Sequence, residues 1–124
     1  MEGHRWIVCG GRDFTDRAFV RRKLDEIAAE RGKPTFVISG GATGADALAE
    51  EWRLDCLLPG VVLEADWPAH GRAAGHKRNS LMLTSLRLFK AARKLVIAFP
   101  GGDGTADMIE QAESAGVEVL KVKP

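Results

Sequence analysis

The sequence predicts an α/β protein of the Rossmann-like type, a three-layer sandwich in which a five-stranded parallel sheet lies between two layers of helices. Short apolar runs alternate with longer amphipathic segments along the chain, which is the pattern of βαβ units. Five runs are predicted to be strands: Arg5–Cys9, Thr35–Ser39, Val61–Ala65, Lys94–Phe99 and Val117–Val122. Right-handed crossovers leave few topologies, and among them we expect the strand order 3-2-1-4-5. In that order the connections diverge between strands 1 and 4, where a ligand cleft is expected.

Apolar residues at helical spacing predict the intervening helices. They are expected over Asp16–Arg31, from Thr43 or Gly44 onward, over Gly75–Ala92 and over Gly104–Ala115. Thr15 is the predicted cap of the first helix, and Asp66–Ala74 is predicted to be irregular. The third helix has an apolar arc wider than one core-facing stripe: Leu81, Met82, Leu83, Leu86, Leu88 and Phe89. Two interpretations stay open, a homo-oligomer interface and a helix enclosed within the fold.

Length and composition limit the possible functions. The 124 residues carry a net charge of +1, so we expect one domain over 1–124 without the basic surplus typical of nucleic-acid binders. Neither a leader nor an apolar run of membrane length is visible, which predicts a cytoplasmic protein with no membrane partner. Cys9 and Cys56 have no partners at metal-ligand spacing and are expected to be reduced thiols. We therefore expect no metal and no cofactor.

Glycine clusters follow three of the predicted strands. A glycine loop before a helix lets a ligand approach backbone N–H groups, and the positive end of the helix dipole favours phosphate. No GK[ST] sequence or GxGxxG pattern is present, so neither standard nucleotide fingerprint applies. The predicted ligand-binding residues of these loops are Gly10, Gly11, Arg12, Gly40, Gly41, Thr43, Gly44, Asp46, Pro100, Gly101, Gly102, Gly104 and Thr105.

A fourth segment, between the third strand and the third helix, adds basic and aromatic side chains. Arg78 and Asn79 are predicted to face the cleft from the first turn of that helix, where an arginine suits a phosphate. Trp67 has two interpretations, a platform for a base and a half-buried loop anchor. Asp66, His70 and His76 do not have the spacing of a standard zinc site.

Several of these motifs, in this order, resemble the YspA-like, YpsA-related proteins of the SLOG superfamily. The resemblance implies a Rossmann-like domain that binds nucleotides or their derivatives. The wider superfamily also includes LOG-type phosphoribohydrolases, which cleave the N-glycosidic bond of nucleoside monophosphates. The matching segments are Gly10–Phe14, Gly40–Asp46, Ala65–Trp67, Gly71, Gly75, Arg78–Asn79, Met82 and Phe99–Asp107.

The LOG comparison implies roles for particular residues and one departure. Arg78 matches the catalytic arginine segment, and Pro100–Thr105 matches the phosphate loop. The motif's glutamate is replaced by Met108, and Asp107 is one residue early, a rotation of about 100° on a helix. The first hypothesis is therefore a binding or sensing domain for a nucleotide-derived phosphate ligand. The alternative is an N-glycoside hydrolase that uses Arg78 and an acid. The acids considered are Asp107, Asp66 and Asp46.

Overall fold

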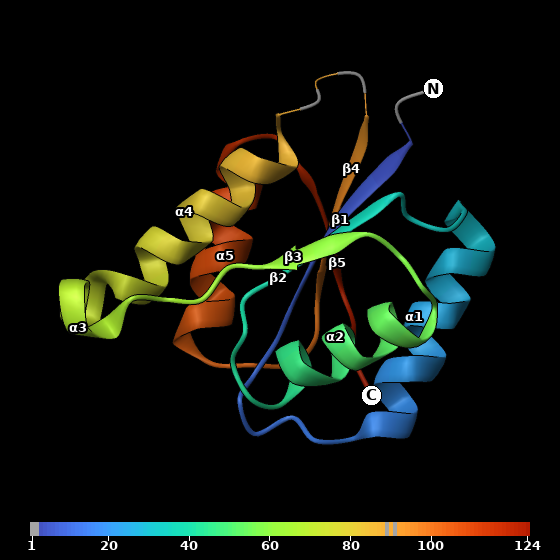
Figure 1. Ribbon diagram of the computed structural model, residues 1–124, viewed down its shortest axis with the longest axis horizontal. Helices are drawn as coiled ribbons and strands as arrows, with labels where there is room; N and C mark the ends of the chain where they lie inside the picture. Colours follow the sequence, from blue (N-terminus) through green and yellow to red (C-terminus); the bar gives the residue numbers. More distant parts are fainter. Residues whose placement is uncertain (1–2, 89, 91) are drawn as a thin grey trace.

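Five parallel strands form one sheet in the order β3-β2-β1-β4-β5 (Figure 1). The computed structural model describes residues 3–88, 90 and 92–124. Its strands are β1 (His4–Cys9), β2 (Phe36–Ser39), β3 (Gly60–Val62), β4 (Arg93–Ala98) and β5 (Glu118–Lys121). β1 pairs with β4 in parallel along its whole length, from His4 beside Arg93 to Cys9 beside Ala98. The predicted strand order is confirmed, with the switch point between β1 and β4.

Helices cover both faces of this sheet, as predicted. α1 (Arg17–Arg31) and α2 (Ala45–Asp55) lie on one face, and α4 (Ala74–Leu86) and α5 (Asp103–Ser114) lie on the other (Figure 1). The short helix α3 (Trp67–His70) precedes α4 and lies at the outer edge of the molecule, beside the beginning of α4. In the described ranges, no helix has the length and apolar character needed to cross a membrane.

Alternation along the two central strands divides the core into two halves. Trp6 and Val8 of β1 join Leu95 and Ile97 of β4 in the cluster under α1 and α2. The residues between them point to the other face, where the cluster under α4 and α5 is built. All six residues of β1 are therefore buried, as expected for a central strand of a doubly covered parallel sheet. The buried residues of this second cluster are Ile7, Cys9, Ile38, Met82, Leu83, Leu86, Val96, Ala98, Met108 and Ala112.

The first helix boundary corrects one expectation. Asp16, and not Thr15, is the N-cap of α1, and its Oδ1 accepts a hydrogen bond of 3.1 Å from the backbone N–H of Phe19. Thr15 is one position too early to reach that donor. At the other end, Gly32 has φ +92°, which ends α1 where the sequence places a glycine.

The segment after β3 is more regular than predicted. The stretch Asp66–Ala74, expected to be irregular, contains α3 and a 3₁₀ turn over Gly71–Ala73. Asp66 caps α3 by accepting a 3.1 Å hydrogen bond from the backbone of Ala69, and Pro68 suits the first turn of a helix. Such a one-turn helix is too short to show hydrophobic periodicity in the sequence.

α4 ends earlier than the predicted boundary at Ala92. Its last residue is Leu86, because the chain then has to return to the amino end of β4. Leu81 and Leu88 are mainly exposed, whereas Phe89 lies outside the described residues. A homo-oligomer through this face stays a prediction.

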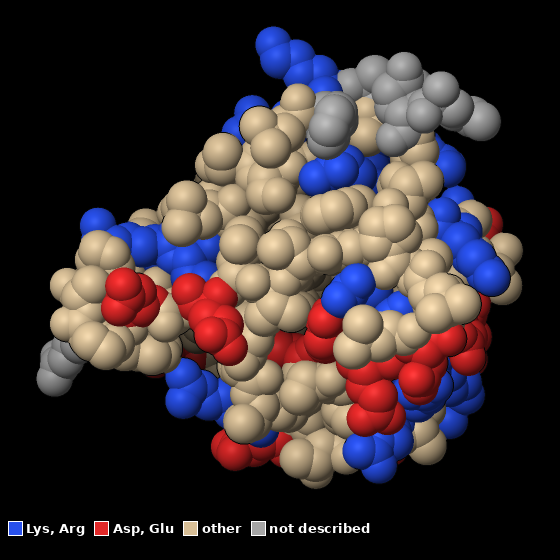
Figure 2. Space-filling model, in the orientation of Figure 1, with Lys and Arg blue, Asp and Glu red and all other residues tan. Residues whose placement is uncertain are grey.

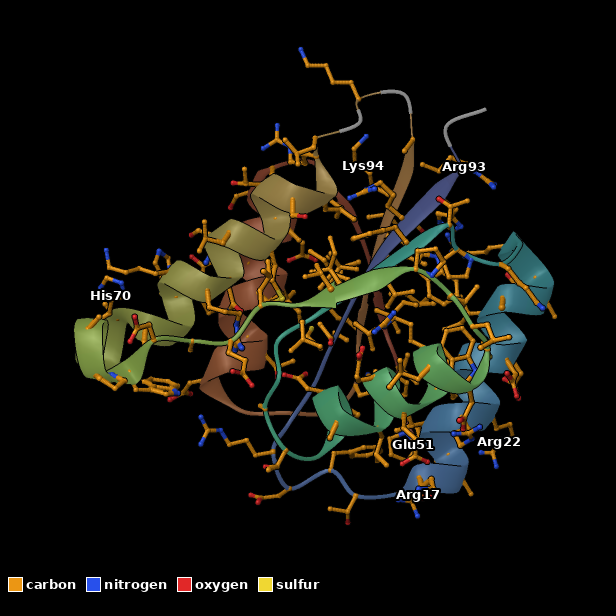
Figure 3. The ribbon with its side chains drawn as sticks, viewed as in Figure 1. Arg17, Arg22, Glu51, His70, Arg93 and Lys94 are labelled. Carbon is orange, nitrogen blue, oxygen red and sulfur yellow. The ribbon has the colours of Figure 1, made fainter. Side chains whose placement is uncertain are left out.

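Charged side chains of both signs are interleaved over α1 and α2 (Figure 2). Arg17 of α1 lies beside Glu51 of α2 (Figure 3), at 3.0 Å. Arg21 pairs with the same carboxylate at 3.2 Å. Exposed pairs of this kind contribute at most about 1 kcal/mol each, so the apolar core supplies most of the helix packing.

The Asp16 cap gives a direct stability test. Asp16→Ala is expected to lower the free energy of unfolding by about 1 kcal/mol, because the N–H of Phe19 loses its acceptor. Urea denaturation followed by circular dichroism measures this change. Thr15→Ala is the matched control and is expected to have little effect; equal losses in both variants would contradict the assignment of the cap.

Candidate functional site

A cleft of about 670 Å³ lies at the carboxyl ends of β1 and β4, at the switch point of the sheet. The loops after β1, β2 and β4 line it together with residues of α2, α3, α4 and α5. Most of the predicted ligand-binding residues are among them: Gly10, Gly11, Arg12, Asp46, Trp67, Arg78, Asn79, Pro100, Gly101, Gly102, Gly104 and Thr105. Arg93 and Lys94 lie at the start of β4, at the opposite end of the sheet (Figure 3).

Close backbone contact between the loops explains several of the glycines. The backbone N–H of Gly11 donates a 2.8 Å hydrogen bond to the carbonyl of Pro100. A Cβ at Gly11 would lie 2.9 Å from the Cα of Gly101, and a Cβ at Gly44 would overlap the carbonyl of Gly11. Gly44 also has φ +72°, which favours glycine. These positions are glycine because the loops after β1, β2 and β4 touch one another.

Gly102 and Gly104 differ from these structural glycines. A Cβ at either position meets no atom within 4 Å, and neither residue has a positive φ. Both line the cleft at the beginning of α5, where Gly102 is the N-cap and contributes no side chain to cap the helix. Nothing in the described part of the chain therefore requires glycine here, and the first N–H groups of α5 face the cleft without a side-chain cap.

Arg78 and Asn79 join the second glycine loop to α5. They lie in the second turn of α4, and not in its first turn as predicted, because α4 begins at Ala74. The guanidinium of Arg78 donates to the carbonyl of Gly40 and, at 3.0 Å, to Oδ1 of Asn79. Asn79 is buried and donates from Nδ2 to the carbonyl of Gly104 at 3.1 Å. These contacts hold Arg78 at the cleft wall.

Asp46 is an acid buried in the same wall. It is 4% exposed, and its Oδ2 accepts a 3.2 Å hydrogen bond from the backbone N–H of Ala42. Its other oxygen, Oδ1, has no hydrogen-bond partner among the described residues. Burial raises the pKa of Asp46 from 3.8 to about 6, although the hydrogen bond from Ala42 and the charges of Arg78 and Arg12 oppose the rise.

The other two acids considered from the sequence lie outside the cleft lining. Asp107 is bound by His76 at 2.8 Å, Asn79 at 3.0 Å and Gln111 at 2.8 Å, in a network between α4 and α5. Burial alone would raise the pKa of Asp107, but these hydrogen bonds together lower it. Asp66 caps α3. A catalytic role for either residue stays a prediction.

A smaller chamber of about 250 Å³ adjoins the cleft. Gly40 and Gly41 line this chamber together with Glu64 and Ala65, which follow β3. Four residues line both cavities: Arg12, Ala42, Trp67 and Arg78. Thr43 and Gly44 line neither, so the structure does not bring all the predicted loop residues to a cavity wall.

Trp67 lies between the two cavities and is 46% exposed. The guanidinium carbon of Arg12 is 5.5 Å from the centroid of its ring, at cation–π distance. The sequence reasoning missed Glu64, because the third strand was predicted to run from Val61 to Ala65, whereas β3 ends at Val62 and leaves Glu64 in the connection that follows. It also missed Gln111, which joins the Asp107 network through α5 packing that no motif reveals.

No group of three or more His, Cys, Asp or Glu side chains that could hold a metal ion occurs within residues 3–88, 90 and 92–124. His70 points outward from α3 (Figure 3). Cys9 and Cys56 are free, and burial raises the pKa of Cys9 to about 12, with a further contribution from Asp46.

The strand order, the two helical layers and the cleft at the switch point define a Rossmann-like α/β protein with glycine-lined loops at the carboxyl end of its sheet. Residues 4–70 match the family described as "YspA, cpYpsA-related SLOG family" (YAcAr). The chain belongs to this family, which confirms the resemblance found in the sequence. The Gene 61 protein of Mycobacterium phage D29 is 31% identical over 126 residues, covering 94% of each chain.

Two solved structures are similar in fold. The protein TM1055 has a TM-score of 0.65 at 19% identity, covering 94% of this chain and 72% of that one. DNA processing protein A (DprA) from Streptococcus pneumoniae has a TM-score of 0.52 at 13% identity, covering 95% of this chain and 58% of that one. At these identities the likeness shows the Rossmann-like fold alone.

The buried carboxyl group gives a prediction for stability against pH. Folded Asp46 binds its proton more tightly than unfolded Asp46, so its contribution to the free energy of unfolding falls as pH rises from about 4 through about 6. Asp46→Asn removes this dependence. We take the free energy of unfolding of the variant minus that of the parent chain. This difference is expected to be about 2 kcal/mol larger at pH 8 than at pH 4.

Urea denaturation at a series of pH values measures this difference. Asp13→Asn removes an exposed carboxylate from the same cleft and is the matched control for the loss of one charge. An Asp46→Asn difference that does not vary with pH would contradict a raised pKa for Asp46.

Proposed function

We propose that this protein binds a nucleotide-derived phosphate ligand in the cleft at the carboxyl ends of β1 and β4. Membership of the SLOG family supports a nucleotide-related ligand in general terms. The observation that carries the proposal is the pair Gly102 and Gly104, which line the cleft although no neighbouring atom and no positive φ excludes a side chain. An occupant that needs close contact with the backbone accounts for glycine at both positions.

Phosphate fits this part of the cleft. The beginning of α5 offers N–H groups and the positive end of the helix dipole, both of which favour an anion. Arg78 adds a cation in the same wall, held in place by Gly40 and Asn79. Among the described residues no carboxylate forms an ion pair with Arg78, so its charge remains available to a ligand. Asp103, in the first turn of α5, is exposed and lines the same cleft, so an anion bound there requires its carboxylate to point toward solvent.

The glycine pair gives a test that separates binding from folding. Gly102→Asp and Gly104→Ala are expected to weaken binding of nucleoside monophosphates about tenfold or more, because they obstruct the N–H groups that contact phosphate. Neither substitution is expected to lower stability, and Gly104→Ala is expected to raise it by up to about 1 kcal/mol, since alanine is the better helix former. Calorimetric titration and thermal unfolding measure the two effects.

Gly116→Ala provides the opposite control. Gly116 follows α5, has φ +74° and lies outside the cleft lining, so alanine is expected to cost about 1 kcal/mol of stability and to leave binding unchanged. If Gly102→Asp and Gly104→Ala bind every nucleoside monophosphate as the parent chain does, the phosphate site is wrong.

A second candidate function is favoured by Asp46. A buried carboxyl group with one unpartnered oxygen in the cleft wall, and a pKa of about 6, suits proton transfer near neutral pH. In an N-glycoside hydrolase, water would add to the anomeric carbon, the bond to the base would break, and the base would leave with a proton. Arg78 would hold the ribosyl phosphate. Asp46 lines the cleft whereas Asp107 does not, so we place the acid at Asp46.

Product analysis tests the hydrolase directly. If the candidate is right, nucleoside monophosphates incubated with the protein release free base, and Asp46→Asn lowers the rate about 100-fold or more while Asp107→Asn has a smaller effect. Recovery of every bound nucleotide intact would leave binding as the function and remove the hydrolase.

A further inference from the structure

The smaller chamber beside the cleft contains side chains that the fold does not use. In the portion of the chain that the structure describes, the carboxylate of Glu64 and the guanidinium of Arg12 form no hydrogen bond and no ion pair. Arg12 contacts the ring of Trp67, which is itself 46% exposed. The connection after β1, which supplies the donor Arg12, and the connection after β3, which supplies the acceptor Glu64 and the aromatic face of Trp67, therefore meet at one cavity of about 250 Å³.

The position of the chamber relates it to the proposed phosphate site. The cleft extends from the beginning of α5 to Arg12, Trp67 and Arg78, and the chamber continues from these three residues to Glu64. A nucleotide whose phosphate lies at α5 would thus direct its base past Trp67 into the chamber. An indole face at such a boundary is suited to stacking on a base.

The polar groups of the chamber select among bases. An ionised carboxylate only accepts hydrogen bonds, so Glu64 requires N–H donors. Guanine presents two adjacent donors, N1–H and the 2-amino group, and its opposite edge presents the acceptors N7 and O6, which arginine binds in a bidentate manner. Adenine presents a ring-nitrogen lone pair beside its amino group and would place it against the carboxylate.

We propose that the chamber of Glu64, Trp67 and Arg12 is a base-recognition subsite that selects guanine nucleotides. Glu64 accepts from N1–H and the 2-amino group, Arg12 or the free Nη2 of Arg78 donates to O6 and N7, and Trp67 stacks on the ring. This inference rests on the proposed phosphate site, because that site sets the direction in which the base enters the chamber.

Calorimetric titration with GMP, IMP and AMP tests the subsite. IMP differs from GMP only by the missing 2-amino group, so it isolates one hydrogen bond to Glu64. The parent chain is expected to bind GMP about tenfold more tightly than IMP, and AMP more weakly than IMP. Glu64→Gln keeps the shape but loses the charge and one acceptor, so the ratio of GMP to IMP affinity is expected to fall close to one.

Glu30→Gln is the matched control. Glu30 is an exposed glutamate near the carboxyl end of α1, outside both cavities, so its substitution removes the same charge and should preserve the preference for GMP. Equal affinity of the parent chain for the three nucleotides would overturn the guanine subsite. A preference for GMP that survives in Glu64→Gln would overturn it as well.

The two proposals fail in different ways. If the three nucleotides bind equally and Gly102→Asp abolishes binding of all three, the phosphate site stands and the base subsite is wrong. If none of them binds the parent chain, both proposals are overturned.

Discussion

The hydrogen bond from Gly11 to Pro100 is the contact on which the architecture of the cleft depends. It holds the loops after β1 and β4 together at the point where their connections run to opposite faces of the sheet. The carbonyl of Gly11 also accepts hydrogen bonds from the backbone of Phe14 at 3.2 Å and of Ala45 at 3.1 Å. The backbone of this one residue therefore links the segment before α1, the beginning of α2 and the loop that precedes α5. The approach of the two loops requires glycine at position 11, because a Cβ there would lie 2.9 Å from the Cα of Gly101.

The glycines of the three loops consequently fall into two physical classes. Gly11 and Gly44 are required by atoms of neighbouring loops, and their replacement would separate those loops. Gly102 and Gly104 face open space, and neither has a positive φ. The first class maintains the geometry of the cleft. The second class leaves the backbone at the beginning of α5 uncovered by side chains in the cleft wall. A run of glycines in a sequence does not distinguish these classes, because the distinction depends on which atoms lie beside each Cα.

Much of the fold could be predicted from the sequence, because short apolar runs and apolar residues at helical spacing report directly on burial. Right-handed crossovers left few possible topologies, and the strand order expected among them is the one observed. What could not be predicted depended on single atoms: the cap at Asp16 instead of Thr15, and the one-turn helix at Trp67. In the site, Asp46 could be predicted because it belongs to a glycine cluster after a strand, and Arg78 because it lies near the beginning of the following helix. The hydrogen bonds of Asp107 with His76, Asn79 and Gln111 could not be predicted, because they arise from the packing of α4 on α5.

The three tryptophans occupy distinct environments, and the chain has no tyrosine. Trp6 and Trp52 are stacked in the core with ring centroids 5.8 Å apart and are almost fully buried, whereas Trp67 borders the cleft and contacts water. Emission from the core pair and emission from the cleft therefore differ in wavelength. Tryptophan fluorescence therefore reports on both regions without an attached label. Quenching at the red edge of the emission spectrum reports ligand binding near Trp67, and the blue edge reports whether the core around Trp6 and Trp52 stays folded.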